Sequence, residues 1–198
     1  VDRGHHERHQ HGGRSDHPFR LGGEAEASRA HDLFRRVRGR FVRAESPSFD
    51  KRAVDRLGRL VASELRKRRA FVSLLRQHQR GDHVRAEWRP YGNRSGGQIL
   101  VLGHLDTVYA AGTLKETPFR VSRGRAWGPG TFDMKSGLVI ALHAMDALTA
   151  RNSLPQKRIV FLWTSDEEIG SGTSRTLIER EARRSDAVLV LEPAAGSA

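Results

Sequence analysis

The stretch RIVFLWTSDEE, residues 158–168, predicts both the fold and the place of its chemistry. Residues 158–165 predict a strand, and residues 159–163 within it are continuously apolar, which is typical of a strand covered on both faces of a parallel sheet. Three acids, Asp166, Glu167 and Glu168, follow this strand directly. Because neighbouring carboxylates repel one another, they stay ionised together only where positive charge lies close by. The stretch therefore predicts a buried strand that ends at a cation.

Strands and helices alternate around this stretch. Residues 96–106, GGQILVLGHLD, predict a turn and a second buried strand, and residues 187–192, AVLVLE, predict a third. Further elements are a strand at 83–91 and a hairpin at 119–128. Helices are predicted at 31–43, at 135–150 and at 174–184, and a further amphipathic helix is predicted to begin after Ser48, its N-cap. We therefore expect an α/β fold with three α/β/α layers and a largely parallel central sheet.

Composition limits the remaining possibilities. The chain has 198 residues, enough for one domain with a core, and a net charge of +12 that comes mainly from arginine. Such a charge suits nucleic acids or anionic surfaces. The arginines are nevertheless spread along the chain without a binding motif, so we predict neither a nucleic-acid nor a membrane partner. With no cysteine, any metal must bind to His, Asp and Glu.

The first 30 residues carry almost no periodic apolar pattern, so we predict a disordered His/Arg-rich tail at 1–30 and a folded part at 31–198. A histidine cluster in this tail offers metal ligands, but we interpret it as incidental; its members are His5, His6, His9 and His11. No secretory signal is visible, which favours a cytoplasmic location.

Polar side chains follow the three predicted strands at their carboxyl ends, where α/β sheets bind ligands. These side chains are His104, Asp106, Glu167, Glu168 and Glu192, and the glycine-rich loop GPGTFD adds Asp133. Taken singly, Asp133 also fits a helix N-cap and Glu192 a surface turn. Histidine with several carboxylates is the ligand set of a hydrolytic zinc site, and the excess of acids favours two metal ions with a bridging carboxylate.

Three segments carry a resemblance to a known family: FVRAESPSFDKRAVDRLGRLVASEL (41–65), HLDTVYAAGTLKETPFRV (104–121) and GPGTFDMKSG (128–137). Over residues 37–195 the chain resembles the M20 family of zinc metallopeptidases, most of all its glutamate carboxypeptidase branch. The resemblance implies a zinc-exopeptidase-like catalytic domain that hydrolyses an amide or peptide bond next to a C-terminal amino acid. It also implies a small peptide or acyl-amino-acid substrate, two Zn²⁺ ions (Co²⁺ or Mn²⁺ as alternatives) and a homodimer.

The resemblance also implies a role for each motif residue. The implied metal ligands are His104, Asp133, Glu168 and Glu192, with Asp133 bridging and Glu168 on the zinc that His104 does not bind. Glu167 is the implied general base for a metal-activated water, and Asp106 is implied to orient the His104 ring. A cis peptide bond is implied after Asp133. Asp166 receives no role.

The family's pattern continues past residue 198, with a lid domain and a later zinc-binding histidine. His143 is the only histidine between the metal motifs, and we expect it to be a packing residue rather than a ligand. One zinc would then lack a ligand, so we expect this chain to be a truncated form with weak or no activity. The alternatives are an N-acyl-amino-acid deacylase or dipeptidase of the same family, a non-catalytic metal-binding fragment, and a basic nucleic-acid-binding protein.

Overall fold

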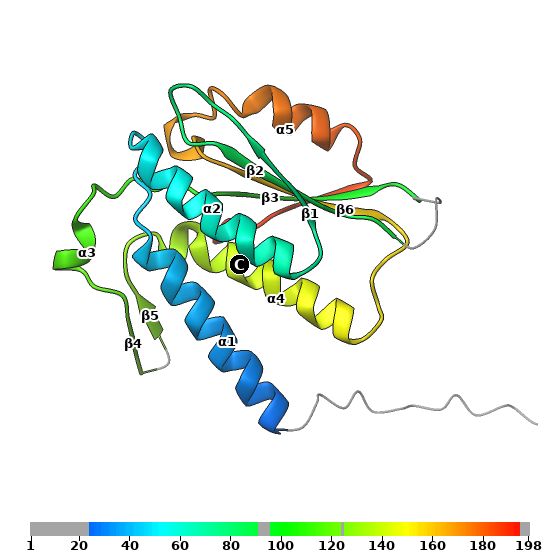
Figure 1. Cartoon of the computed structure of the whole chain (residues 1–198), viewed down its shortest axis with the longest axis horizontal. Helices are drawn as coiled ribbons and strands as arrows, with labels where there is room; N and C mark the ends of the chain where they lie inside the picture. Colours follow the sequence, from blue (N-terminus) through cyan, green and yellow to red (C-terminus); the bar gives the residue numbers. More distant parts are fainter. Residues whose placement is uncertain (1–23, 91–95, 124, 195–198) are drawn as a thin grey trace, which may run out of the picture.

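One five-stranded sheet organises the chain (Figure 1). The computed structural model describes residues 24–90, 96–123 and 125–194. The strand order is β1–β2–β6–β3–β7. The bounds are β1 Phe71–Leu75, β2 His83–Trp88, β6 Arg158–Thr164, β3 Gln98–His104 and β7 Ala187–Val190.

The sheet is parallel where its strands carry the predicted ligands and antiparallel at the other side. β3 pairs in parallel with both β6 and β7. β2 pairs antiparallel with β6, and β1 pairs antiparallel with β2. The predicted α/β fold is confirmed. The sheet is mixed because β2 runs antiparallel to β6, and β1, which the sequence pattern did not predict, extends this antiparallel side.

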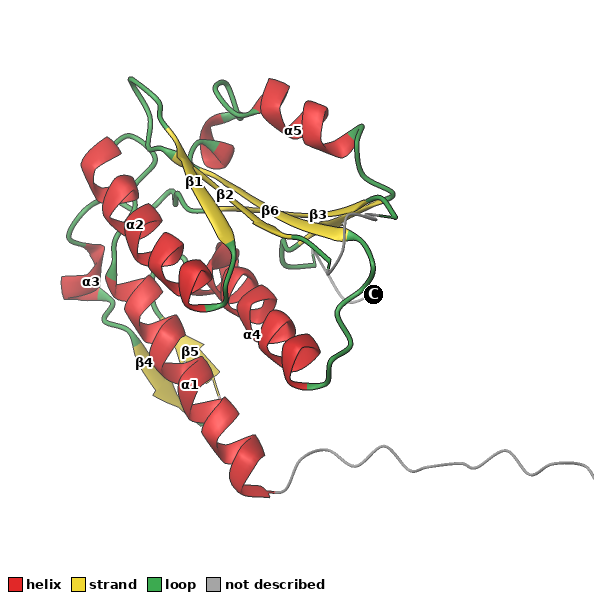
Figure 2. Cartoon of the chain, turned by 45° about the vertical axis from the view of Figure 1, so that its right-hand side comes forward, coloured by secondary structure: helices red, strands yellow, loops and turns green. Residues whose placement is uncertain are grey.

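Helices cover both faces of the sheet (Figure 2). On one side lie α1 (Glu24–Arg43), α2 (Lys51–Lys67) and α4 (Ser136–Ala150), and on the other lies α5 (Arg175–Ala182). The main core forms under the three helices and includes Leu57, Leu142 and Trp163. A smaller core under α5 is built on Leu100, Val160 and Leu162. Residues of β6 alternate between the two cores, which explains why its sequence is continuously apolar.

Two predicted boundaries at the N-terminal end differ from the structure. Helix α1 begins at Glu24, so residues 24–30 are helical rather than part of a tail (Figure 1). Residues 1–23, including the histidine cluster, lie outside the described residues. The N-cap of α2 is Asp50, whose side chain accepts a hydrogen bond from the Ala53 N–H, and not Ser48. The Ser48 hydroxyl instead donates to the Asp106 carboxylate and to the Thr107 carbonyl oxygen, so it is not available to cap the helix.

Strand β7 is exposed, contrary to the prediction of a buried strand. All four of its residues are exposed, with Leu189 at 52% and Val190 at 60%. β7 lies at the edge of the sheet, and none of its residues belongs to either core, so both of its faces are exposed.

The predicted hairpin at 119–128 is confirmed as β4 (Arg120–Ser122) and β5 (Arg125–Trp127). A short helix, α3 (Thr113–Glu116), precedes the hairpin. Within the described ranges, no helix combines the length and apolar character needed to cross a bilayer.

Candidate metal centre

The parallel strands bring the predicted ligands to one edge of the sheet. Leu102 of β3 is in register with Leu162 of β6 and Val190 of β7, so the three strands end at nearly the same level. His104 is the last residue of β3, and Glu192 lies just after β7. Glu167 and Glu168 open the single 3₁₀ turn that follows β6.

Asp133 reaches the same edge from the turn Thr131–Lys135, which precedes α4. The peptide bond between Asp133 and Met134 is cis, as the family resemblance implied. The turn begins after Gly130, whose φ of 65° lies in the left-handed region that favours glycine. The Met134 sulfur accepts a hydrogen bond from the His104 backbone N–H at 3.1 Å, which joins this turn to the end of β3.

Four carboxylates surround one imidazole at this edge. His104 Nε2 lies 3.0 Å from Asp133 Oδ1, 3.3 Å from Glu192 Oε1 and 3.7 Å from Glu167 Oε2. Two sets of possible ligand atoms each lie within 4.8 Å of one another: His104 with Glu167 and Glu192, and His104 with Asp133 and Glu168. The imidazole is buried, whereas the carboxylates of Asp133, Glu167 and Glu192 are partly exposed, so the cluster opens towards solvent.

The His104 ring is oriented through its other nitrogen. Nδ1 lies 2.9 Å from the backbone carbonyl oxygen of Asp106. Because a carbonyl oxygen only accepts hydrogen bonds, Nδ1 carries a proton, and the neutral ring then has its lone pair on Nε2. That lone pair faces the carboxylate cluster. The Asp106 carboxylate is also close, at 3.4 Å from Nδ1, but the backbone carbonyl makes the shorter contact.

The Asp106 carboxylate has a second task that sequence reasoning missed. It accepts hydrogen bonds from the backbone N–H groups of Glu167 at 3.2 Å and Glu168 at 3.3 Å. The Ser48 hydroxyl donates to the same carboxylate at 2.8 Å. Asp106 is almost fully buried, so these three donors satisfy a charge that water does not reach. One carboxylate thus aligns the end of β3 with the turn after β6.

Asp166 also acquires a position in the structure. Its Oδ2 accepts hydrogen bonds from the Thr173 N–H at 2.6 Å and from the Thr173 hydroxyl at 2.8 Å, and its carbonyl accepts from the Ser171 N–H. His83 of β2 contacts both the Ser165 and the Thr173 hydroxyls, at 3.0 Å and 3.3 Å. These contacts close the loop 166–173 around Glu167 and Glu168, a geometry that sequence spacing does not show.

The protonation equilibria show an excess of negative charge. Burial alone would lower the pKa of His104, but its contact with Asp106 and the charges of Glu192 and Glu167 raise the pKa to about 9. Burial, together with the charges of Asp133 and Glu167, raises the pKa of Glu192 to about 7. Burial and the neighbouring Asp133 also raise the pKa of Glu168. Bound positive charge would relieve this repulsion, so the donor set fits a divalent cation.

The predicted ligands His104, Asp133, Glu168 and Glu192 therefore lie together, with Glu167 beside them. Their individual roles, and that of Asp106 in catalysis, stay predictions. His143 lies on α4 with its Nδ1 3.8 Å from Asp146, and it belongs to neither ligand set among the described residues.

Known proteins share this sequence pattern and this fold. Residues 100–197 match the family described as peptidase family M20/M25/M40. Carboxypeptidase G2 from Pseudomonas sp. (strain RS-16) is 42% identical over 100 residues, which cover 50% of this chain and 24% of that protein. A succinyl-diaminopimelate desuccinylase from Corynebacterium glutamicum is 36% identical over 70 residues, 35% of this chain and 18% of that protein.

Among solved structures, human carnosine dipeptidase 1 aligns with a TM-score of 0.68 and 21% identity, covering 84% of this chain and 39% of that chain. The M20 family metallo-carboxypeptidase Sso-CP2 from Sulfolobus solfataricus aligns with a TM-score of 0.67 and 20% identity, covering 82% and 37%. The chain spans about a quarter of the length of the carboxypeptidase G2 relative. The structural likeness at these identities supports the fold.

Proposed function

Because residues 100–197 match the family described as peptidase family M20/M25/M40, we propose that this chain carries the metal centre of a hydrolase that cleaves an amide bond next to a C-terminal amino acid. The observation that supports the proposal is the convergence of His104 Nε2 with the carboxylates of Asp133 and Glu192, at 3.0 Å and 3.3 Å. Carboxypeptidase G2, as a relative, favours this reaction over the others considered. The activity, substrate and oligomeric state of the whole protein are part of the proposal.

The residues that would hold the metal are His104, Asp133, Glu168 and Glu192. Zinc fits this combination of one imidazole with carboxylates, and the number of acids suits two ions, with Asp133 between them. A divalent cation there supplies positive charge that polarises an amide carbonyl and acidifies a nearby water molecule. His104 would offer Nε2 as its ligand atom, because Nδ1 keeps its proton against the Asp106 carbonyl.

Glu167 is the proposed general base. Its carboxylate is about half exposed and lies 3.7 Å from His104 Nε2, at the solvent side of the cluster. The Asp106 carboxylate accepts a hydrogen bond from the Glu167 backbone N–H, so this contact fixes the backbone and does not involve the Glu167 carboxylate. Glu167 thus accepts a proton from water that approaches the amide carbonyl, and then returns this proton to the leaving amine.

Two neighbouring substitutions test these assignments. Glu167→Gln should keep zinc binding and lower hydrolysis of an N-acyl-glutamate by about 10²- to 10⁴-fold, because a general base is lost. Glu168→Gln should weaken zinc binding itself. Zinc affinity, measured by competition with a chromophoric chelator, checks both variants independently of turnover. Equal zinc affinity in the parent and in Glu168→Gln would contradict the ligand assignment.

A second candidate is an N-acyl-amino-acid deacylase, which the desuccinylase relative favours. Both candidates hydrolyse an amide with the same groups and differ in which side of the bond the enzyme recognises. A paired assay separates them: an acyl group varied on a constant glutamate, and an amino acid varied under a constant succinyl group. Discrimination mainly by the amino acid supports the carboxypeptidase, and discrimination mainly by the acyl group supports the deacylase.

A further inference from the structure

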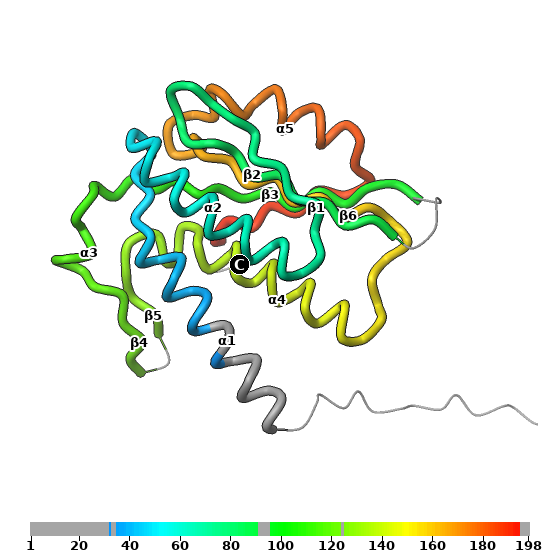
Figure 3. Tube along the Cα trace, in the orientation of Figure 1, coloured from blue at the N-terminus to red at the C-terminus, as the bar shows by residue number. Residues whose placement is uncertain are grey.

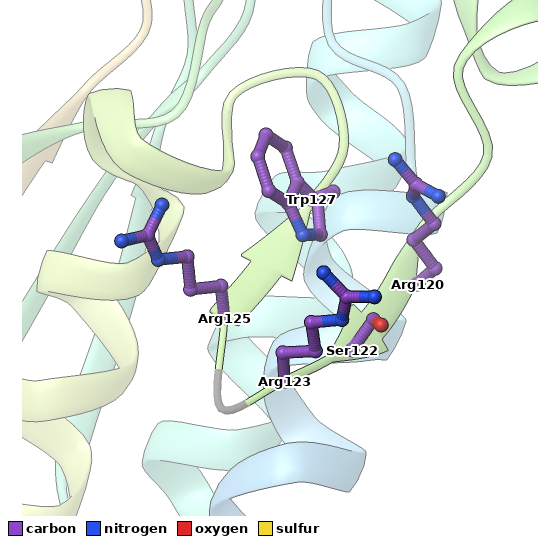
Figure 4. A pocket seen from close by; sticks show the side chains of 5 residues that line it. All are labelled: Arg120, Ser122, Arg123, Arg125 and Trp127. Atoms are coloured by element: carbon purple, nitrogen blue, oxygen red, sulfur yellow. The ribbon is translucent and has the colours of Figure 1, made fainter.

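A second concentration of charge lies on the hairpin β4–β5 and has the opposite sign. Residues 120, 122, 125 and 127 alternate along the two strands, so they share one face of the hairpin. Arg120 is opposite Trp127, and Ser122 is opposite Arg125. With Arg123 these side chains line a hollow of about 600 Å³. In Figure 4, Arg120 and Arg125 stand on opposite sides of Trp127, and Arg123 reaches towards it.

Helix α1 contributes to a second hollow beside the hairpin. A smaller neighbouring hollow of about 330 Å³ shares Arg120 and is lined by Phe119 and Val121 together with three arginines of α1, Arg35, Arg36 and Arg43. The Arg43 guanidinium lies 5.1 Å from the centre of the Phe119 ring, and that of Arg120 lies 5.4 Å from the centre of the Trp127 ring. Arg120 thus borders both hollows, and the arginines around them come from segments about 80 positions apart in the sequence.

These arginines differ in their neighbours from the arginines that pair with buried glutamates elsewhere in the chain. Arg40, Arg68 and Arg85 each form an ion pair with a buried glutamate. No described carboxylate pairs with Arg120, Arg123 or Arg125, and no acidic residue lines either hollow among the residues that the structure describes. Guanidinium groups gathered without counter-charges repel one another, and an anion between them would remove that cost.

The shape of the surface selects a small ligand. A hollow of about 600 Å³ has the size of an ordinary small-molecule site. Trp127 is 43% exposed within it and offers an apolar side to the ligand. Guanidinium forks bind carboxylate and phosphate oxygens in pairs, and Arg120 connects the two hollows. We propose that this hairpin surface binds a small ligand with at least two oxyanion groups, phosphates or carboxylates.

Calorimetric titration of the whole chain with tripolyphosphate and with citrate tests the proposal and distinguishes the two kinds of oxyanion. The key variant is Arg123→Gln with Arg125→Gln. Its matched control is Arg180→Gln with Arg184→Gln, which removes the same charge from exposed positions on α5 and just after it. We expect at least about a tenfold loss of affinity in the first variant, and a change within about twofold in the control, because only the first removes direct contacts.

Two further measurements distinguish this site from the metal centre and from a surface for macromolecules. Asp133→Asn alters the candidate metal centre, so anion binding that survives this change is independent of the proposed function. Trp88 and Trp163 are buried, so a fluorescence change on binding should disappear in Trp127→Phe. Equal affinities in the two arginine variants would overturn the proposal. Binding of an oligonucleotide or of phosphatidylglycerol vesicles without binding of either small anion would also overturn it, in favour of a macromolecular partner.

Discussion

Ser48→Ala tests whether the support beneath the metal centre matters for metal binding. The Ser48 hydroxyl donates to Asp106 Oδ2 at 2.8 Å, and both residues are almost fully buried. Loss of a hydrogen bond to a buried charged acceptor costs about 1.5–3 kcal/mol. Asp106 keeps its backbone donors from Glu167 and Glu168, so we expect the lower half of this range for the change in unfolding free energy.

The effect on metal affinity should be smaller than that of losing a ligand. Removing a direct partner of a metal ligand typically weakens binding about 10- to 100-fold. Ser48 acts one contact further away, through Asp106, so we expect zinc affinity to fall about three- to tenfold. Unfolding in urea with a chelator present measures the stability change, and chelator competition measures the zinc affinity.

Ser46→Ala is the matched control. Ser46 is equally buried, and its hydroxyl donates to the Leu105 carbonyl at 2.7 Å without contacting Asp106. This variant should lose about 0.5–1.5 kcal/mol of stability and leave zinc affinity within about twofold of the parent. If both variants weaken zinc binding equally, or if Ser48→Ala destabilises the fold without changing zinc affinity, the proposed path from Ser48 through Asp106 is refuted.

Three other predictions concern the surroundings of the site. Thr173→Val removes the hydroxyl that donates to Asp166, so we expect a loss of about 1–3 kcal/mol in urea unfolding and weaker zinc binding, whereas Thr173→Ser should restore both. Burial lowers the pKa of His83 below its usual 6.5, so the unfolded chain binds more protons below that pH and stability should fall as pH drops. His83→Gln should flatten this dependence between pH 7.5 and 5.5, and unchanged curves would contradict it. Gly130→Ala should destabilise the fold by about 1–3 kcal/mol in thermal unfolding, because φ is 65° and the added Cβ would lie 2.6 Å from a Thr107 methyl carbon.

The sequence predicted the convergence of the candidate ligands better than the boundaries of the elements around them, for a physical reason. Parallel buried strands have a recognisable apolar pattern, and their carboxyl ends meet at one edge, so the positions of His104 and Glu192 follow from strand order. The predicted N-cap of α2 was wrong because Ser48 and Asp50 are both residue types that suit an N-cap, and the local sequence does not distinguish them. Only the distant contact with Asp106 decides between them, and it engages Ser48.

Other features depended on contacts that no local pattern records. Strand β7 has the apolar sequence of a central strand, but it lies at the edge of the sheet and outside both cores, so Leu189 and Val190 are exposed. The arginines of α1 and of the hairpin β4–β5 are scattered along the sequence because these two segments are far apart in it. Their gathering around Trp127 and Phe119 appears only after these segments have packed side by side (Figure 3).

The contacts made by Asp106 also bear on how tolerant this site is to change. The Asp106 carboxylate accepts hydrogen bonds from the backbone N–H groups of residues 167 and 168. Every amino acid except proline has such an N–H group. These two contacts therefore do not depend on which side chains stand at these two positions. Other acids, bases or metal ligands can be placed at these two positions, by mutation or by design, while both hydrogen bonds to Asp106 are kept.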